Sequence, residues 1–399
     1  MLQERRVGEA VPDAVRAHLH ELPAELLAAV LSATGPRRTR SVKDKRGLLD
    51  ALDWQGVRDD ADAHVVGVIV RQRLGDLRLL DRLPGKVRKP WEADASHAQL
   101  QHGIQTRDAV AISRKLSSYG IRHAFVKGFA YRHLFYRPQW IRLGGDIDLL
   151  IDRSDSERVR QLMRLLGFTQ ASCRADYQRY RPATAWEIAR VEAGHYELVQ
   201  FVKDHLLVNA PLSVLSKPFV QRVPFAFERI GGDAVLHSCV DIHWALHFAF
   251  RGASPLATLG TVETAAGFSL PVLTPEWNLV FSAFKLYNEA FDRPRFGFAH
   301  LIDLRAILTQ EAEHLDWALI ERIVNAHSLE AAMFYTLSAA ERLAQTNLLP
   351  AKLRARWSEF LSANGGPASA AERGDFVPHM LGRRVPADYV DGGGAVDRA

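Results

Sequence analysis

The sequence predicts a fold of the α/β or α+β class with helical regions before and after it. Between residues 123 and 167, short apolar strands alternate with helices, which is the pattern of such a fold. The residues before 120 and after 275 instead place apolar side chains at helical spacing. A length of 399 residues favours two or three domains.

Three helical segments are expected before the first strand. Their apolar stripes cover residues 22–31, 65–77 and 100–116. Pro84-Gly85 interrupts the pattern after the second segment, and residues 86–91 are therefore predicted to be a linker. Gly120 follows the third segment, at a position where glycine commonly ends a helix.

The central region is predicted to contain two strands, each followed by a helix. Strands are expected at residues 123–126 and 146–152, and helices at 129–136 and 154–166. Ser154 and Glu157 have the spacing of a capping box at the start of the second helix, and Gly167 is placed to end it.

More strands and then more helices are expected toward the C-terminus. Residues 195–203 are predicted to be a strand, and Gly231-Gly232-Asp233 predicts a hairpin between 225–230 and 234–246. Helical periodicity returns at Pro275. These patterns divide the chain into an N-terminal helical region (1–95), a core (96–274), a C-terminal helical region (275–367) and a loosely ordered tail (368–399).

The composition indicates a soluble globular protein in a reducing compartment. Hydrophobic residues make up 47% of the chain and charged residues 24%, as in globular domains. No stretch approaches the roughly 18 uninterrupted apolar residues of a membrane span, and the first residues lack the apolar core of a signal peptide. Cys173 and Cys239 show no metal or redox spacing. We therefore expect a cytoplasmic location and no membrane partner.

The charge of the chain is mildly basic. A net charge of +5 fits an anionic ligand such as a nucleotide without establishing nucleic-acid binding. The basic residues between Arg37 and Arg46 are interpreted first as a solvated linker or helix entry, with polyanion binding as the alternative. No zinc finger, RNA-binding aromatic motif or long basic stripe is present, so a nucleic-acid partner is not indicated.

The most informative residues are Asp146 and Asp148 at the head of an apolar run. Residues two apart on a strand share a face, so the two carboxylates are predicted to lie side by side. Their mutual repulsion is commonly offset by a bound cation. With Lys127-Gly128 upstream, the pattern indicates a metal-dependent phosphoryl-transfer site. The alternative is that the aspartates are turn and cap residues before an ordinary buried strand.

Several motifs together resemble one family. They are Val126-Lys127-Gly128, Arg142, the run from Asp146 to Ile151, and Asp241-Ile242-His243-Trp244, with Tyr136 and Pro138 between the first two. Over residues 100–310 the chain resembles the uncharacterised bacterial nucleotidyltransferases of the DNA polymerase β-like superfamily. One departure is that Lys127-Gly128 replaces the Gly-Gly or Gly-Ser turn of the wider superfamily.

The resemblance implies an α+β fold whose polymerase β-like core has a mixed sheet. It also implies a metal site of three carboxylates, with Asp241 joining Asp146 and Asp148, that binds Mg²⁺, or alternatively Mn²⁺. The implied enzyme is a nucleotidyltransferase that moves a nucleoside monophosphate from a nucleoside triphosphate to a hydroxyl of an unidentified acceptor, a small molecule, a peptide or protein, or an RNA. The structural alternative for Asp241 is an ion pair with an arginine.

Four residues are predicted to bind the nucleotide. Gly128 frees the backbone to approach a phosphate, and Lys127 is expected either to touch phosphate or to be solvated. Arg142 is predicted to clamp phosphate oxygens or to pair with Asp146. Lys285 is expected to bind base or phosphate, with simple solvation as the alternative.

Three further residues are expected near the metal ligands. His243 shares a face with Asp241, and its alternatives are ligand, hydrogen-bond partner or packing residue. His195 and Glu197 share a face in the same way and are predicted to support the ligands or the acceptor. Two other functions remain open at this point, namely a phosphotransferase on the same scaffold and a non-catalytic nucleotide-binding regulatory protein.

Overall fold

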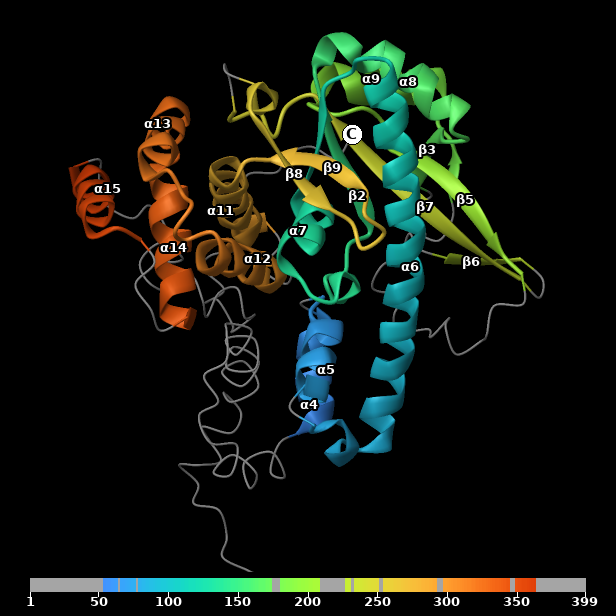
Figure 1. Ribbon diagram of the computed structural model, residues 1–399, viewed down its shortest axis with the longest axis horizontal. Helices are drawn as coiled ribbons and strands as arrows, with labels where there is room; N and C mark the ends of the chain where they lie inside the picture. Colours follow the sequence, from blue (N-terminus) through green and yellow to red (C-terminus); the bar gives the residue numbers. More distant parts are fainter. Residues whose placement is uncertain are drawn as a thin grey trace, which may run out of the picture.

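The computed structural model describes residues 53–63, 65–76, 78–173, 180–208, 227–230, 233–250, 254–292, 297–344 and 349–363 (Figure 1). Three expectations lie outside these ranges, namely the helix at 22–31, the basic cluster at 37–46 and the tail at 368–399. In the described ranges, no helix is long and apolar enough to cross a membrane.

A mixed sheet forms the centre of the molecule. Within the described ranges it has nine strands in the order β4-β3-β5-β7-β2-β1-β9-β8, and β6 pairs with β7 outside this path. The strands are β1 (His123–Val126), β2 (Asp146–Ile151), β3 (Thr169–Cys173), β4 (Tyr180–Pro182), β5 (Phe201–Leu207), β6 (Phe227–Ile230), β7 (Asp233–His243), β8 (Leu259–Glu263) and β9 (Ser269–Leu273). The predicted hairpin is confirmed as β6 and β7, which pair antiparallel with Ile230 opposite Asp233.

The register of the central strands brings the aspartates together. β2 runs antiparallel to β1 and parallel to β7, and Asp148 is the partner of Asp241 in the parallel pair. Partners in a ladder point to the same side of a sheet, so these two carboxylates lie on one face with Asp146. The apolar residues Ile147 and Leu149 point to the opposite face and are fully buried.

Different helices cover the two faces of the sheet. α7 (Lys127–Phe135) packs on β1 and β2 on the aspartate side. α6 (Gly85–Ser118) crosses the other side, where its Asp108 carboxylate lies 3.4 Å from the Nζ atom of Lys203 in β5. α8 (Ser156–Leu165) packs beside α6. The aspartates therefore face α7 and not the long helix.

The predicted linker at residues 86–91 is wrong, because these residues form the first turns of α6. Pro84 is the N-cap, and Pro90 lies inside the helix at a cost of about 3 kcal/mol in a helix interior. Val87 and Trp91 are fully buried, and their burial offsets this penalty. The expected domain boundary at residue 95 falls inside α6, so one helix joins the N-terminal helices to the sheet.

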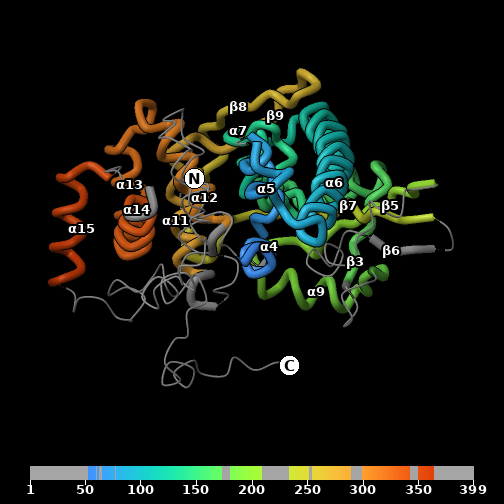
Figure 2. The backbone as a smooth tube through the Cα atoms, turned by 90° about the horizontal axis from the view of Figure 1, so that it is seen from below, coloured from blue at the N-terminus to red at the C-terminus, as the bar shows by residue number. Residues whose placement is uncertain are grey.

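Helices flank the sheet on both sides, as predicted. α4 (Trp54–Ala63) and α5 (Gly67–Asp76) lie along the first half of α6. The C-terminal group consists of α11 (Pro275–Asp292), α12 (Gly297–Gln310), α13 (Trp317–His327), α14 (Glu330–Ala344) and α15 (Ala351–Ala363). Figure 2 shows this group at one end of the molecule and β3 and β5 at the other. The α+β class with a mixed sheet is thus confirmed.

The capping box predicted at Ser154 and Glu157 is wrong. α8 begins at Ser156 after a short 3-10 turn, its N-cap Asp155 makes no side-chain capping bond, and Glu157 pairs with Arg160 instead of closing a box with Ser154. A capping box does exist at Thr184, before α9 (Ala185–Gly194).

The strand expected at residues 195–203 begins only at Phe201. His195 is the C-cap of α9, and Glu197 makes an isolated bridge to His243. The segment still lies beside the end of β7, because the Leu198 amide donates to the Ile242 carbonyl at 2.8 Å and the Trp244 amide donates to the Tyr196 carbonyl at 3.0 Å.

Candidate functional site

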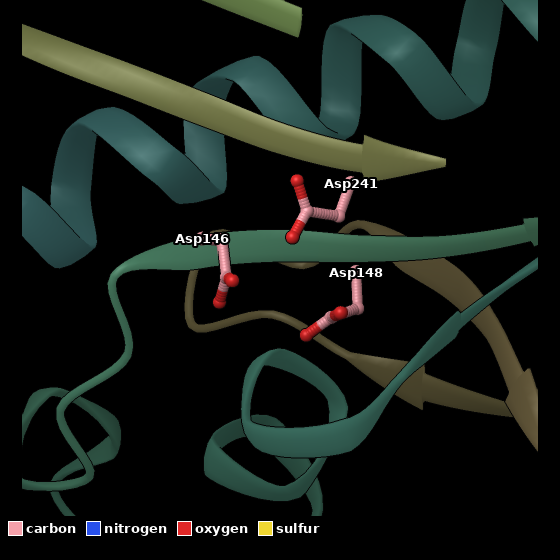
Figure 3. A group of neighbouring side chains, drawn as sticks. All are labelled: Asp146, Asp148 and Asp241. Carbon is pink, nitrogen blue, oxygen red and sulfur yellow. The ribbon is translucent and has the colours of Figure 1, made fainter. Parts of the chain in front are cut away.

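Three aspartates from two neighbouring strands converge on one point. Asp146 and Asp148 come from β2 and Asp241 from β7, and one carboxylate oxygen of each lies within 4.8 Å of the others. Figure 3 shows the side chains pointing toward one another. Asp148 is 3% exposed, and the other two are partly buried. Their period-two spacing and the β2–β7 register produce this cluster, so the aspartates are not turn or cap residues.

The aspartates carry unbalanced negative charge. Burial, and then repulsion from Asp148 and Asp241, raises the pKa of Asp146 to about 8. Burial and Asp148 also raise the pKa of Asp241. Burial alone would raise the pKa of Asp148 as well, but Lys127 and His243 hold it below its usual range. Hard oxygen ligands with excess negative charge fit a divalent cation such as Mg²⁺.

Lys127 neutralises part of this charge. Its Nζ atom donates a 2.5 Å hydrogen bond to Asp148 Oδ1 and lies 3.1 Å from His243 Nε2. Burial would lower the pKa of Lys127, but the three carboxylates raise it above its usual value. Its backbone has a φ of 54°, a conformation that costs a non-glycine residue about 1–3 kcal/mol. The simple solvated alternative for Lys127 is therefore wrong.

His243 connects Asp148 to Glu197 and, through Glu197, to His195. Its Nε2 atom lies 3.0 Å from Asp148 Oδ1, and its Nδ1 atom lies 3.1 Å from Glu197 Oε2. The other oxygen of Glu197 lies 3.2 Å from His195 Nδ1. Burial and Lys127 oppose a charge on His243, but Asp148 and Glu197 raise its pKa. The structure thus brings His243, Glu197 and His195 together in a row of polar contacts that begins at Asp148.

Asp241 is held by an amide and not by an arginine. Gln200 donates a 2.7 Å hydrogen bond from Nε2 to Asp241 Oδ1. Among the described residues, no arginine forms an ion pair with Asp241, so the structural alternative predicted for this residue is not observed. The hydrogen bond fixes the orientation of the Asp241 carboxylate.

Arg142 pairs with Asp303, which is neither of its predicted partners, a phosphate or Asp146. Its guanidinium forms a two-pronged ion pair with Asp303 of α12, at 2.8 Å from Nε and 2.6 Å from Nη2, and Nη1 donates to the Leu143 carbonyl. Tyr136 also donates to Asp303, at 2.6 Å. Both members of the pair are buried. The pairing with Asp146 is not observed, and direct clamping of phosphate is disfavoured, because three of the five N–H groups of this buried guanidinium already donate to Asp303 and Leu143.

Arg142 nevertheless lies against the Lys127-Gly128 turn. A Cβ atom added at Gly128 would lie 3.5 Å from Arg142 Nη2, so the guanidinium underlies the Lys127-Gly128 turn. Lys285, in α11, acts on the cluster through space, because its charge helps to lower the pKa of Asp146 and Asp148. Lys127 in α7 and Lys285 in α11 therefore act on the aspartates from two helices.

Sequence reasoning missed the groups that hold the turn before Asp146. Gln105 donates to the Gly144 and Gly145 carbonyls at 3.3 and 3.2 Å, and Gln101 donates to the Gly144 carbonyl at 3.2 Å. Arg132 Nη1 in turn donates to Gln105 Oε1 at 2.7 Å. The available signal was a pair of glutamines four residues apart on the buried face of a helix.

Arg132 lies directly under this turn. A Cβ atom at Gly144 would be 2.4 Å from Arg132 Nη2, which explains why glycine occupies this position. Burial, and then the charge of Arg142, lowers the pKa of Arg132 to about 10. The guanidinium thus provides a buried positive charge beneath the turn that leads to Asp146, the aspartate whose pKa is raised to about 8.

The chain is similar to a known protein family over most of its length. Residues 50–345 match the model of a family described as uncharacterised nucleotidyltransferase. A solved structure, described as an antigenic nucleotidyltransferase-like protein from Paracoccidioides brasiliensis, is 14% identical, with a TM-score of 0.27, over 57% of this chain and 91% of that chain. No curated protein matches. Since the family model covers most of the sequence, this chain belongs to the family of uncharacterised nucleotidyltransferases.

Proposed function

We propose that this protein is a Mg²⁺-dependent enzyme that transfers a nucleoside monophosphate from a nucleoside triphosphate to a hydroxyl group of an acceptor, with release of pyrophosphate. The observation that carries the proposal is the convergence of three carboxylates within 4.8 Å on one sheet face. Membership of a nucleotidyltransferase family supports the general reaction.

The aspartates Asp146, Asp148 and Asp241 would hold the metal. A divalent ion bound there supplies positive charge to the phosphates and lowers the pKa of a coordinated hydroxyl. The two raised aspartate pKa values support this assignment, because a cluster that resists ionisation in the absence of a cation is stabilised by one. Mn²⁺ prefers similar oxygen ligands and is expected to substitute for Mg²⁺.

Residues around the aspartates would bind and orient the triphosphate. Lys127 and Lys285 supply positive charge next to the carboxylates, where the phosphate oxygens would lie. Gly128 leaves room at the start of α7, whose first amide groups and helix dipole favour an anion. Arg142 would act through Gly128 and not by direct contact.

His243 and Glu197 would keep Asp148 in position. His243 contacts both carboxylates, so it ties the orientation of Asp148 to a residue that precedes β5. Partners of this kind orient metal ligands and typically change metal affinity about 10–100-fold when removed. His195 would contribute indirectly, through its contact with Glu197.

The test is a reaction with Mg²⁺ and each of the four nucleoside triphosphates, radiolabelled at either the α- or the γ-phosphate. Label from the α-phosphate on the acceptor, with pyrophosphate release, is the expected result. Label from the γ-phosphate alone would identify a phosphotransferase instead. Binding without transfer to small-molecule, peptide or RNA acceptors would favour a non-catalytic regulator.

Two variants make this experiment specific to the cluster. The double variant Asp146→Asn/Asp148→Asn is expected to lose transfer and metal binding. The matched control is Asp152→Asn, since Asp152 lies just after the same strand but pairs with the exposed Arg122. Equal activity of the double variant and the control would contradict the proposed site.

A further inference from the structure

A stack of aromatic rings leads outward from the metal ligands. His243, which contacts Asp148, is 1% exposed at its side chain, and its ring is stacked on Tyr196 at a centroid distance of 5.8 Å and an interplanar angle of 24°. Tyr196 stacks in turn on His195, at 4.6 Å and 24°. The His195 side chain is 40% exposed. The stack therefore runs from the buried end of the site to its surface.

Phe248 stands at the outer end of this stack. Its ring meets Tyr196 edge to face at 4.9 Å and 89°, and His195 at 5.8 Å and 73°. The ring of His247 also meets it, at 5.8 Å and 69°. Phe248 is nevertheless 50% exposed. A large apolar side chain that packs against neighbouring rings and is still open to solvent presents a surface on which a planar ligand can stack.

The backbone around Phe248 is fixed on both sides. Ala249 donates from its amide to His247 Nδ1 at 3.1 Å, and the Phe250 amide donates to the His247 carbonyl at 3.0 Å. The rings of His247 and Phe250 both pack on Phe284 of α11, at 4.8 and 5.1 Å. Phe248 is thus the residue of this turn that points outward while its neighbours anchor it.

Lys285 relates this surface to the aspartates. Its charge helps to lower the pKa of Asp146 and Asp148, and together with burial and His195 it also helps to lower the pKa of His247. The residue before Lys285 in α11, Phe284, packs on the ring of His247 at 4.8 Å, next to Phe248 in the chain. A cation and an aromatic surface therefore accompany the carboxylates, as the phosphates and the base of a nucleotide require.

We propose that Phe248, supported by Tyr196 and His195, stacks on the base of the nucleoside triphosphate. This inference rests on the proposed function and adds the subsite that distinguishes a nucleotide from a bare polyphosphate. Stacking on an aromatic side chain uses the flat face that every base has, so it provides affinity without requiring one particular base. The expected ligand class is a nucleoside triphosphate, bound through both its phosphates and its base.

The test compares the binding of ATP with the binding of inorganic tripolyphosphate by calorimetry, with Ca²⁺ in place of Mg²⁺ to prevent turnover. Phe248→Ala is expected to weaken ATP binding about tenfold, the effect of one lost base-stacking contact, and to leave tripolyphosphate binding unchanged. Phe248→Tyr keeps the ring and is expected to bind ATP as the wild type does. Phe360→Ala is the matched control, because Phe360 is similarly exposed at 44% but lies in α15.

A second variant keeps the inference testable if Phe248→Ala does not fold. The added indole fluorescence of Phe248→Trp, measured as the difference from the wild type, is expected to be quenched by ATP and not by tripolyphosphate. Equal weakening of both ligands by Phe248→Ala, no weakening of either, or an effect confined to the KM of the acceptor would overturn the base contact. A wild-type protein that binds neither ligand would instead refute the proposed function, and with it the subsite.

Discussion

At the scale of single residues, the aspartate cluster opposes the stability of the fold that holds it. The pKa of Asp146 is raised from 3.8 to about 8 by burial and by its two neighbours, which means that the folded protein disfavours its charged form. Protonation of the three carboxylates is coupled, so this behaviour belongs to the group. Strain of this kind is common where function needs groups that the fold alone would not select.

Replacing Asp146 with asparagine is expected to stabilise the metal-free protein. Because the folded-state pKa is raised, the wild type loses stability as pH rises from about 4 to about 8, whereas the variant does not. The difference in Tm between Asp146→Asn and the wild type should therefore widen over this range. Thermal unfolding in the presence of chelator at several pH values measures it, and a variant less stable than the wild type above pH of about 8 would contradict the explanation.

The Gly144→Ala substitution should damage the site through Arg132. The new Cβ atom would lie 2.4 Å from Arg132 Nη2, so the guanidinium or the turn before Asp146 must move. We expect a loss of about 1–3 kcal/mol in the free energy of unfolding and weaker Mn²⁺ binding. Urea denaturation and a Mn²⁺ titration measure the two effects.

The matched control for Gly144 is Gly103 in α6. A Cβ atom at Gly103 meets no other atom within 4 Å, and alanine is the better helix former, so Gly103→Ala should be neutral or stabilising by up to about 1 kcal/mol. If Gly144→Ala behaved as the control does, the close approach of Arg132 would not explain this glycine.

At the scale of secondary-structure elements, long-range pairs lock the site to the helices around it. Arg142 precedes β2, and its partner Asp303 lies in α12. The ion pair is fully enclosed and shares Asp303 with Tyr136. It connects the loop that leads to the aspartates with the C-terminal helices, so it is expected to set the position of both.

Asp303→Ala is predicted to be strongly destabilising. The substitution leaves the Arg142 guanidinium buried without its counter-charge, and breaking a buried pair in this way costs about 3–5 kcal/mol. Equilibrium unfolding in urea gives the loss directly. For comparison, Asp152→Asn removes an exposed pair with Arg122 and should cost less than about 1 kcal/mol. Similar losses for the two variants would show that the buried pair contributes little.

At the scale of the whole molecule, the proposed ligand would join parts of the chain that are far apart in sequence. β2 and β7 supply the carboxylates, α7 supplies Lys127, and α11 supplies Lys285 (Figure 1). A nucleotide with its metal would therefore contact the sheet and the C-terminal helices at once. Binding to the folded state only would stabilise all of these elements together.

Metal and nucleotide together are expected to raise the Tm of the wild type. At a ligand concentration of about 100 times the Kd, the gain is about 2.7 kcal/mol. The double variant Asp146→Asn/Asp148→Asn should show no such gain, even if it is more stable without ligand. Differential scanning calorimetry with Ca²⁺ and ATP measures the shift. An equal shift in the variant would place the nucleotide elsewhere in the molecule.

Local patterns in the sequence were sufficient for many of the elements and for two of the three clustered carboxylates. Period-two spacing alone puts Asp146 and Asp148 on one face, and helical periodicity after Pro275 correctly predicts the C-terminal helices. Local patterns failed where tertiary contacts override propensity. Burial of Val87 and Trp91 carries α6 through Pro90, and the capping box predicted at Ser154 did not form.

The sequence by itself determined the family and the strand that carries two of the carboxylates. Only the tertiary structure decided that Asp241 lies beside Asp148 in the β2–β7 register, that Asp303 is the partner of Arg142, and that an aromatic stack leads from His243 to Phe248. The physical reason is that periodicity records which side of an element a residue occupies. Which element packs against that side depends on burial and charge pairing across the whole chain.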